Sequence, residues 1–330
     1  MSALSILAGV ETRYFSLARH ALVSGLRAAK IGPGKTVLLP EFICRDLLAA
    51  IHTVGARVEY YPVGPDLTPA LPDLNWPMSS AVLAVNYFGF PQDLGVFWAY
   101  SQRTGALLIE DNAHGFLSRD AAGTLLGLRA PVGLFSMRKT FAIPDGAALS
   151  AVGPVAAALP HQAPFTGSGL ARAQPIKGRI RSIPIVGGFL LYVAKAGVRS
   201  MRLLFTGQPL PVSAGESESS IDAASEPWSE LQAALAAVDI DVEGERRRLL
   251  YLEFERVATE HGVRPLFHEL PAGCVPYGFA FRRCSLEYAV IERLAARYGF
   301  EVTSWPDLPS EVVPIAPAHY QDVRVVKFLT

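Results

Sequence analysis

Apolar residues along the first half of the chain follow two alternating patterns. Short, continuous apolar runs predict buried strands in the segments 32–40, 56–63, 79–89, 106–111, 131–137 and 146–153. Between them, apolar residues recur at helical spacing in the segments 16–31, 45–55 and 94–105. Strands and helices therefore alternate through about residue 110, and several of the strands are apolar on both faces.

This alternation is typical of an α/β fold with a mostly parallel central sheet and helices on both faces. In open sheets of this kind, ligands bind beyond the carboxyl ends of the strands. The residues that follow each predicted strand are therefore the candidates for chemistry.

A change in composition divides the chain. The segment 215–230 is acidic and rich in serine, which is typical of a loop or linker. We place a boundary there, with a large α/β domain at 1–225 and a small C-terminal α+β domain at 226–330. The small domain contains a predicted strand at 275–283 and a predicted helix at 285–299.

The charge and the cysteines exclude several classes of protein. Lysine plus arginine equals aspartate plus glutamate, at 30 each, which argues against a general nucleic-acid binder. The three cysteines form no CxxC pair, so neither a disulfide framework nor a structural zinc site is expected. The first residues lack the pattern of a secretion signal, and no apolar run reaches the length of a membrane span. We therefore expect a cytoplasmic protein.

Three polar residues lie at the carboxyl ends of two predicted strands. Asp111 ends the run ALLIED, whereas Ser136 and Lys139 follow the run GLF. A helix that begins near residues 16–19 would reach the same sheet edge with its N-terminus. The histidines show no metal-ligand spacing, and no glycine-rich phosphate-loop motif is present. A lysine, a carboxylate and anion-binding donors together suit pyridoxal 5'-phosphate (PLP), which needs a Schiff-base amine, a partner for its ring nitrogen and a phosphate site.

The order and spacing of these segments resemble the DegT/DnrJ-type sugar aminotransferases, which have the aspartate-aminotransferase fold (fold type I). The resemblance rests on LLIEDNAHG, on FSMRKTFAIPDGAAL with Lys139 following Asp111, on the opening FSLARHALVSGLRAAKIGPGKTVLLPEF and on AVNYFGFPQDL. The segment GERRRLLYLEF resembles the arginine-rich helix that enters the small domain of that family. The resemblance covers most of residues 10–150 and returns in 226–310.

The resemblance implies roles for individual residues. Lys139 matches the Schiff-base lysine, and Asp111 matches the acid that pairs with the pyridine nitrogen. His114 stands where the family usually has glutamine, near the cofactor ring. Ser136 matches the phosphate-binding serine, although it precedes the lysine by only three residues.

The remaining implied contacts concern anions. Ala18 and Arg19 match the small-residue pair whose amides surround the phosphate, and Arg138 is a candidate contact for phosphate or substrate. Two positions depart from the family pattern. Cys44 stands where an aromatic residue often stacks on the ring, although a small core residue is the simpler interpretation. Ala147 replaces the second glycine of a usual pair.

The resemblance implies an aminotransferase that moves an amino group from a donor, expected to be glutamate, to a keto-sugar carried by a nucleotide. Two alternatives stay open. The short spacing between Ser136 and Lys139 also resembles class V enzymes such as cysteine desulfurases, for which Cys274 would be the candidate persulfide carrier. A non-catalytic descendant of the fold, acting as a binding protein, is the other.

The segment 146–215 contains no aspartate or glutamate and has seven basic residues. A basic amphipathic helix within 172–205 could lie weakly on an anionic membrane surface, although packing on the large domain is the simpler interpretation. The resemblance also implies a homodimer in which each subunit completes the other's phosphate site. We expect the acid-free segment to make that contribution, through Lys177, Arg179 or Arg181.

Overall fold

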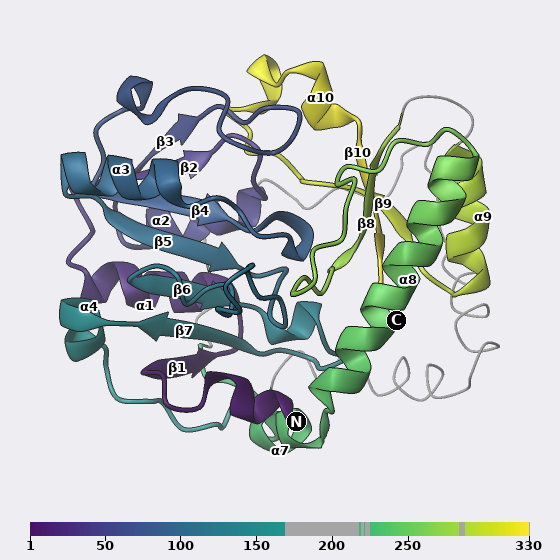
Figure 1. The fold of residues 1–330 in the computed structure, drawn as a ribbon. Helices are drawn as coiled ribbons and strands as arrows, with labels where there is room; N and C mark the ends of the chain where they lie inside the picture. Colours follow the sequence, from purple (N-terminus) through teal and green to yellow (C-terminus); the bar gives the residue numbers. More distant parts are fainter. Residues whose placement is uncertain (169–217, 219–220, 222–224, 284–287, 330) are drawn as a thin grey trace, which may run out of the picture.

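The computed structural model describes residues 1–168, 218, 221, 225–283 and 288–329. A seven-stranded sheet forms the centre of the first part, in the order β1-β7-β6-β5-β4-β2-β3 (Figure 1). The strands are β1 (Thr12–Phe15), β2 (Thr36–Pro40), β3 (Arg57–Tyr61), β4 (Ala81–Val85), β5 (Leu107–Asn112), β6 (Val132–Phe135) and β7 (Ala147–Ala151). The five strands from β3 to β6 are mutually parallel, and β7 is antiparallel to both of its neighbours, β6 and β1.

Helices cover both faces of this sheet (Figure 1). They are α1 (Ala18–Ala28), α2 (Leu48–Thr53), α3 (Gly95–Thr104) and α4 (Gly153–Ala158). Short 3₁₀ turns lie at η1 (Ala3–Leu7), η2 (Arg45–Leu47), η3 (Asp73–Asn75), η4 (Tyr87–Gly89) and η5 (Met137–Lys139). Helix α1 packs on β6 and β7 through its buried side, whereas α3 packs on β4 and β5. Each strand that the apolar runs predict in this part is present.

The C-terminal part is built on a three-stranded antiparallel sheet in the order β8-β10-β9. Its elements are α7 (Leu231–Ala237), α8 (Ile240–Glu260), β8 (Gly278–Arg282), α9 (Ala289–Arg297), β9 (Val302–Ser304), η9 (Val313–Ile315), α10 (Ala318–Gln321) and β10 (Val323–Lys327). The long helix α8 begins at the N-cap Asp239, whose carboxylate accepts hydrogen bonds from the N–H groups of Asp241 and Val242. In Figure 1, α8 runs from beside α7 to beside α9, and it packs on β8 and α9.

The two parts share their hydrophobic interior. Leu231 and Leu235 of α7 pack with Leu7 and Phe116 of the first part, and the N–H of Ala3 donates to the carbonyl of Val238 at 3.1 Å. The larger core cluster likewise extends from the seven-stranded sheet into the three-stranded one. The boundary between residues 225 and 226 stays a prediction, because α7 packs on the part that precedes it.

Several predictions lie outside the described residues. They are the basic helix within 172–205, the segment 169–215 of the acid-free region and the start of the predicted helix at 285–287. None of the described helices is both long enough and apolar enough to cross a lipid bilayer.

Candidate active site

The carboxyl ends of the parallel strands bring the predicted residues to one edge of the sheet. Asp111 is the penultimate residue of β5, and Ser136 directly follows β6. These two strands are neighbours, with Asp111 opposite Leu134 in the register. Lys139 ends the 3₁₀ turn η5, which its own N–H closes by donating to the carbonyl of Ser136 at 3.1 Å. The chain therefore holds the lysine only one turn beyond the strand that carries it.

Lys139 and His114 are in direct contact. The Nζ of Lys139 lies 3.2 Å from the Nε2 of His114. Burial lowers the pKa of the Lys139 amine, and the neighbouring Cys44 and Asp111 partly oppose this shift. Burial also lowers the pKa of His114 well below its ordinary value, with a further contribution from the positive charge of Lys139. The site therefore favours a neutral imidazole and, more than in water, a neutral lysine amine.

Asp111 is a buried carboxylate beside this pair. Its side chain is 7% exposed, and its Oδ1 accepts a hydrogen bond from the N–H of Ala113 at 2.9 Å. Burial raises the pKa of the Asp111 carboxyl, while the nearby Lys139 charge and the Ala113 N–H partly oppose the shift. A carboxylate in such surroundings gains most from a positively charged partner. A protonated pyridine nitrogen would be such a partner.

Donors for an anion gather on the other side of the lysine turn. Ser136 directly precedes this turn and is 2% exposed. Arg138 forms no ion pair within the described part of the chain, and burial lowers the pKa of its guanidinium. The N–H of Arg138 donates to Gly146 O, and the N–H of Gly146 donates to Ser16 O, so this turn adjoins the start of α1. Ala18 and Arg19 open that helix, whose first turn directs N–H groups out of its end.

A buried polar network of Glu110, Arg129 and Asn86 lies next to the site. Glu110, which is fully buried, accepts hydrogen bonds from the Nε of Arg129 at 2.8 Å and from the Nδ2 of Asn86 at 2.8 Å. Arg129 also donates to the Oδ1 of Asn86 at 2.9 Å. Because Glu110 precedes Asp111 in β5 and Asn86 follows β4, this network fixes the ends of two strands that frame the site. The sequence marks Asn86 as a strand-end residue but indicates no partner for it.

The C-terminal part supplies aromatic residues that sequence patterns did not reveal. The ring of Tyr277 stacks on His114 with centroids 4.4 Å apart and an interplanar angle of 12°. Trp305, also from the C-terminal part, meets His114 edge-on at 5.3 Å, whereas Phe88 of η4 in the first part is nearly parallel to His114 at 5.7 Å. The predicted strand at 275–283 contains Tyr277, but its apolar pattern carries no information about the partner of the ring.

The positions that depart from the family pattern have different surroundings. Cys44 is half-buried at the start of η2 and lies close enough to Lys139 that the lysine charge opposes the rise in the pKa of the buried thiol. Cys44 packs against the large core cluster, as the simpler interpretation expects, and it also lies within reach of the Lys139 charge. Ala147 is buried in β7, where its Cβ is accommodated. The glycine that this turn needs is Gly146, with φ at +136° and Leu231 2.9 Å from any added Cβ.

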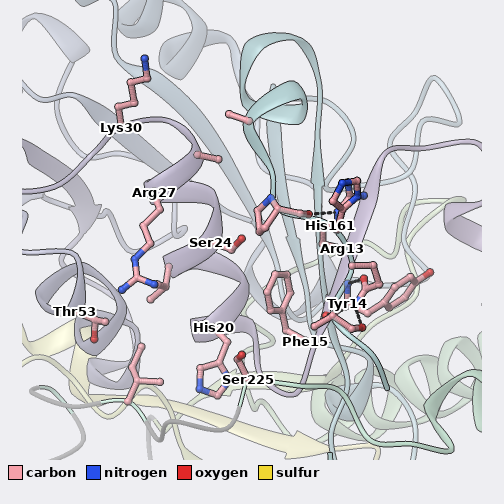
Figure 2. A pocket seen from close by; sticks show the side chains of 17 residues that line it. Arg13, Tyr14, Phe15, His20, Ser24, Arg27, Lys30, Thr53, His161 and Ser225 are labelled. Atoms are coloured by element: carbon pink, nitrogen blue, oxygen red, sulfur yellow. Dashed lines mark hydrogen bonds between the residues drawn. The ribbon is translucent and has the colours of Figure 1, made fainter. Parts of the chain in front are cut away.

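A cavity of about 640 Å³ lies elsewhere, between α1, β1 and the segment 158–163 (Figure 2). Arg13, Arg27 and Lys30 line it, and its described lining contains no carboxylate. None of the predicted site residues lines this cavity. Because the Lys139 amine and the Asp111 carboxylate do not line this cavity, we assign the candidate active site to the strand ends around Lys139.

The first part of the chain also has recognisable relatives. Residues 15–152 match the DegT/DnrJ/EryC1/StrS aminotransferase family. The resemblance that the sequence motifs predict is therefore confirmed, and the matched segment contains every candidate site residue of the large domain.

Two curated relatives illustrate the match. Over 120 residues the chain is 29% identical to UDP-N-acetyl-3-dehydro-alpha-D-glucosamine 3-aminotransferase of Acidithiobacillus ferrooxidans, covering 35% of this chain and 32% of that protein. Over 97 residues it is 33% identical to dTDP-4-dehydro-2,3,6-trideoxy-D-glucose 4-aminotransferase of Saccharopolyspora spinosa, covering 28% and 25%. The chain matches only 24% to 39% of the length of these and two further curated relatives.

Solved structures extend the similarity to the whole fold. PseC of Helicobacter pylori, an aminotransferase involved in the biosynthesis of pseudoaminic acid, superimposes with a TM-score of 0.63 at 14% identity. That comparison covers 98% of this chain and 83% of PseC. The predicted fold, type I α/β with a mostly parallel sheet, is confirmed.

Proposed function

We propose that this chain is a PLP-dependent aminotransferase that moves an amino group, with glutamate as the expected donor, to a keto-sugar linked to a nucleotide. The observation that carries the proposal is the contact between Lys139 and His114 at 3.2 Å, beside the buried carboxylate of Asp111. The family match over residues 15–152 supports the same reaction class.

The residues present fit the cofactor. Asp111 would hold the ring nitrogen. Burial raises the pKa of its carboxyl, and a positively charged pyridine nitrogen beside it would stabilise the carboxylate form. Lys139 would hold the carbonyl carbon, and burial keeps its pKa lowered toward the reactive neutral amine. Ser136, Arg138 and the first amides of α1 would receive the phosphate, since they gather around one turn of the chain.

In the reaction, PLP when bound supplies a sink for the electrons left behind when a proton leaves the donor's α-carbon. Lys139 Nζ would take that proton from the donor's α-carbon and deliver it to the cofactor's carbonyl carbon, and the same two transfers would run in reverse with the acceptor, because Nζ is the amine placed at the site. His114 holds Lys139 Nζ from one side, so that the amine keeps its position when it is free. Proton transfer by a positioned group contributes about 10²- to 10⁴-fold in rate.

The experiment is direct. The purified protein is mixed with PLP, and the absorbance of lysine-bound cofactor is compared between the wild type and Lys139→Ala. We expect the band in the wild type alone, and amino transfer from glutamate to one member of a panel of nucleotide-linked keto-sugars. A colourless wild type that takes up no added PLP would contradict the proposal.

The cysteine desulfurase alternative gains no support from the surroundings of Cys274. Its side chain is fully buried, and its Sγ donates to the carbonyl of Gly89 at 3.1 Å. Burial raises the pKa of this thiol to about 12. A persulfide carrier needs an accessible thiolate, which this position disfavours. The same experiment tests the binding-protein alternative. A protein that retains PLP but transfers no amino group from any donor would support that alternative.

We further propose that the chain forms a homodimer with shared active sites, an arrangement that the resemblance of the sequence motifs implies. Obligate interfaces of this type often bury above about 2,000 Å². Sedimentation at micromolar concentration tests the proposal, and a stable monomer that binds PLP tightly would contradict it. The segment expected to reach across, which includes Lys177, Arg179 and Arg181, lies outside the described residues.

A further inference from the structure

Arg247 in α8 joins the lysine turn to the C-terminal part. Its side chain is 1% exposed, and its Nε donates to Glu243 Oε1 at 2.6 Å. The two terminal nitrogens donate to three carbonyls, those of Thr140 at 2.6 Å, Tyr277 at 3.0 Å and Pro276 at 3.2 Å. Thr140 directly follows Lys139. One guanidinium therefore fixes both the backbone beside the lysine and the backbone of Tyr277.

Tyr277 transmits this position to His114. Its N–H donates to the carbonyl of Phe88 at 2.8 Å, and its carbonyl accepts from Arg247, so its backbone is held on both sides. Its ring then lies on the His114 ring with centroids 4.4 Å apart and nearly parallel planes. The Tyr277 side chain is only 7% exposed, which leaves the imidazole little room to rotate.

The orientation of His114 determines which of its nitrogens meets the lysine. Its Nδ1 accepts from the N–H of Phe88 at 3.4 Å, so the neutral ring carries its proton on Nε2. That Nε2–H faces Lys139 Nζ at 3.2 Å. An N–H group can donate to a neutral amine but not to an ammonium ion, which has no lone pair. This arrangement therefore favours the unprotonated lysine.

We propose that Arg247 and Tyr277 are positioning residues, which hold the Nε2–H of His114 against Lys139 and so keep the lysine as a neutral amine. The proposal concerns the chain's own residues. It rests on the proposed function only in the role that it gives to Lys139.

The test measures Lys139 in cofactor-free protein. The rate of its reductive methylation by formaldehyde is followed against pH, and the modified peptide is quantified by mass spectrometry. Tyr277→Phe keeps the stacked ring, whereas Tyr277→Leu removes it. Arg247→Lys removes donors to the carbonyls of Thr140, Pro276 and Tyr277, and Arg246→Lys is the matched control, because Arg246 shares the Glu243 partner but does not contact the lysine turn.

We expect Tyr277→Leu and Arg247→Lys to shift the midpoint of methylation upward by about one pH unit, which is about a tenfold lower rate near neutral pH. Tyr277→Phe and Arg246→Lys should keep the wild-type midpoint. A wild-type midpoint in folded Tyr277→Leu would overturn the proposal. If Arg247→Lys does not fold, as judged by circular dichroism, the two Tyr277 variants decide the question.

In protein loaded with PLP, Tyr277→Leu and Arg247→Lys should lower kcat by about tenfold with little change in KM, since only the proton-transfer step depends on the lysine's position. Failure of the proposed function gives a different result. Even if the wild type binds no PLP, Tyr277→Leu and Arg247→Lys should still shift the methylation midpoint upward from the wild-type value when the positioning proposal is correct.

Discussion

The Nζ of Lys139 lies 3.2 Å from the Nε2 of His114, and the His114 ring is in turn stacked on Tyr277 from the C-terminal part. The reactive amine is thus held by a chain of contacts that begins in the parallel sheet and ends in a different part of the molecule. Burial lowers the pKa values of both Lys139 and His114, which favours the neutral form of each group more than water does.

Asp111→Asn is expected to change the pH dependence of the free energy of unfolding and to reduce amino transfer. Burial raises the pKa of the Asp111 carboxyl, so the folded state binds more protons than the unfolded state above the ordinary pKa of 3.8. Stability of the wild type should therefore fall as the pH rises through this window, and the asparagine variant lacks that loss. Urea unfolding of cofactor-free protein between pH 4 and pH 7 measures the difference. A stability gap between the two proteins that does not change with pH would contradict this assignment. With PLP bound, the variant should lose most of its amino transfer.

Arg138→Met and Ser136→Ala are expected to weaken binding of PLP much more than binding of pyridoxal, which lacks the phosphate. Hydrogen bonds to charged groups are worth about 1.5–3 kcal/mol, so each change should cost about ten- to a hundredfold in the PLP dissociation constant. Fluorescence titration with both ligands measures the ratio. Arg27→Met is a matched control, because Arg27 lines the separate cavity of Figure 2. Equal losses for PLP and pyridoxal would place the phosphate elsewhere.

Arg129→Met is expected to lower the free energy of unfolding by about 3–5 kcal/mol, because it leaves the buried Glu110 without its cationic partner. Chemical unfolding of cofactor-free protein measures the loss. The control is Arg103→Met, whose ion pair with Asp73 is more exposed and should contribute about 0–1 kcal/mol. Similar losses in the two variants would show that the network next to the site contributes no more than a surface pair.

Cys274 is expected to stay unmodified when the native protein is treated with iodoacetamide at pH 8. Burial raises the pKa of its thiol to about 12, so very little thiolate is present. Cys274→Ser should keep amino transfer within about threefold, since the residue lies outside the proposed machinery. Rapid labelling of Cys274, or release of sulfide from cysteine that this substitution abolishes, would instead support the desulfurase alternative.

The local pattern of apolar residues predicts most of the strands and helices in the first part of the chain. Continuous apolar runs predict strands because a parallel sheet buries both of its faces, and β2 and β4 are buried at every position. The positions of Asp111, Ser136 and Lys139 at the ends of their strands follow from the same runs, since parallel strands end at one edge. A reader of the sequence can therefore place the lysine and the carboxylate together without coordinates.

The partners of these residues could not be read in the same way. Arg247 donates to the carbonyl of Thr140, 107 residues away in the chain, and no periodicity relates the two positions. Tyr277 reads as the start of a buried strand, and only the packing of the C-terminal part against the sheet decides that its ring covers His114. The reason is physical. Strand and helix patterns reflect local backbone geometry and the burial of one face, whereas a specific side-chain contact depends on how two separately formed elements are oriented in three dimensions.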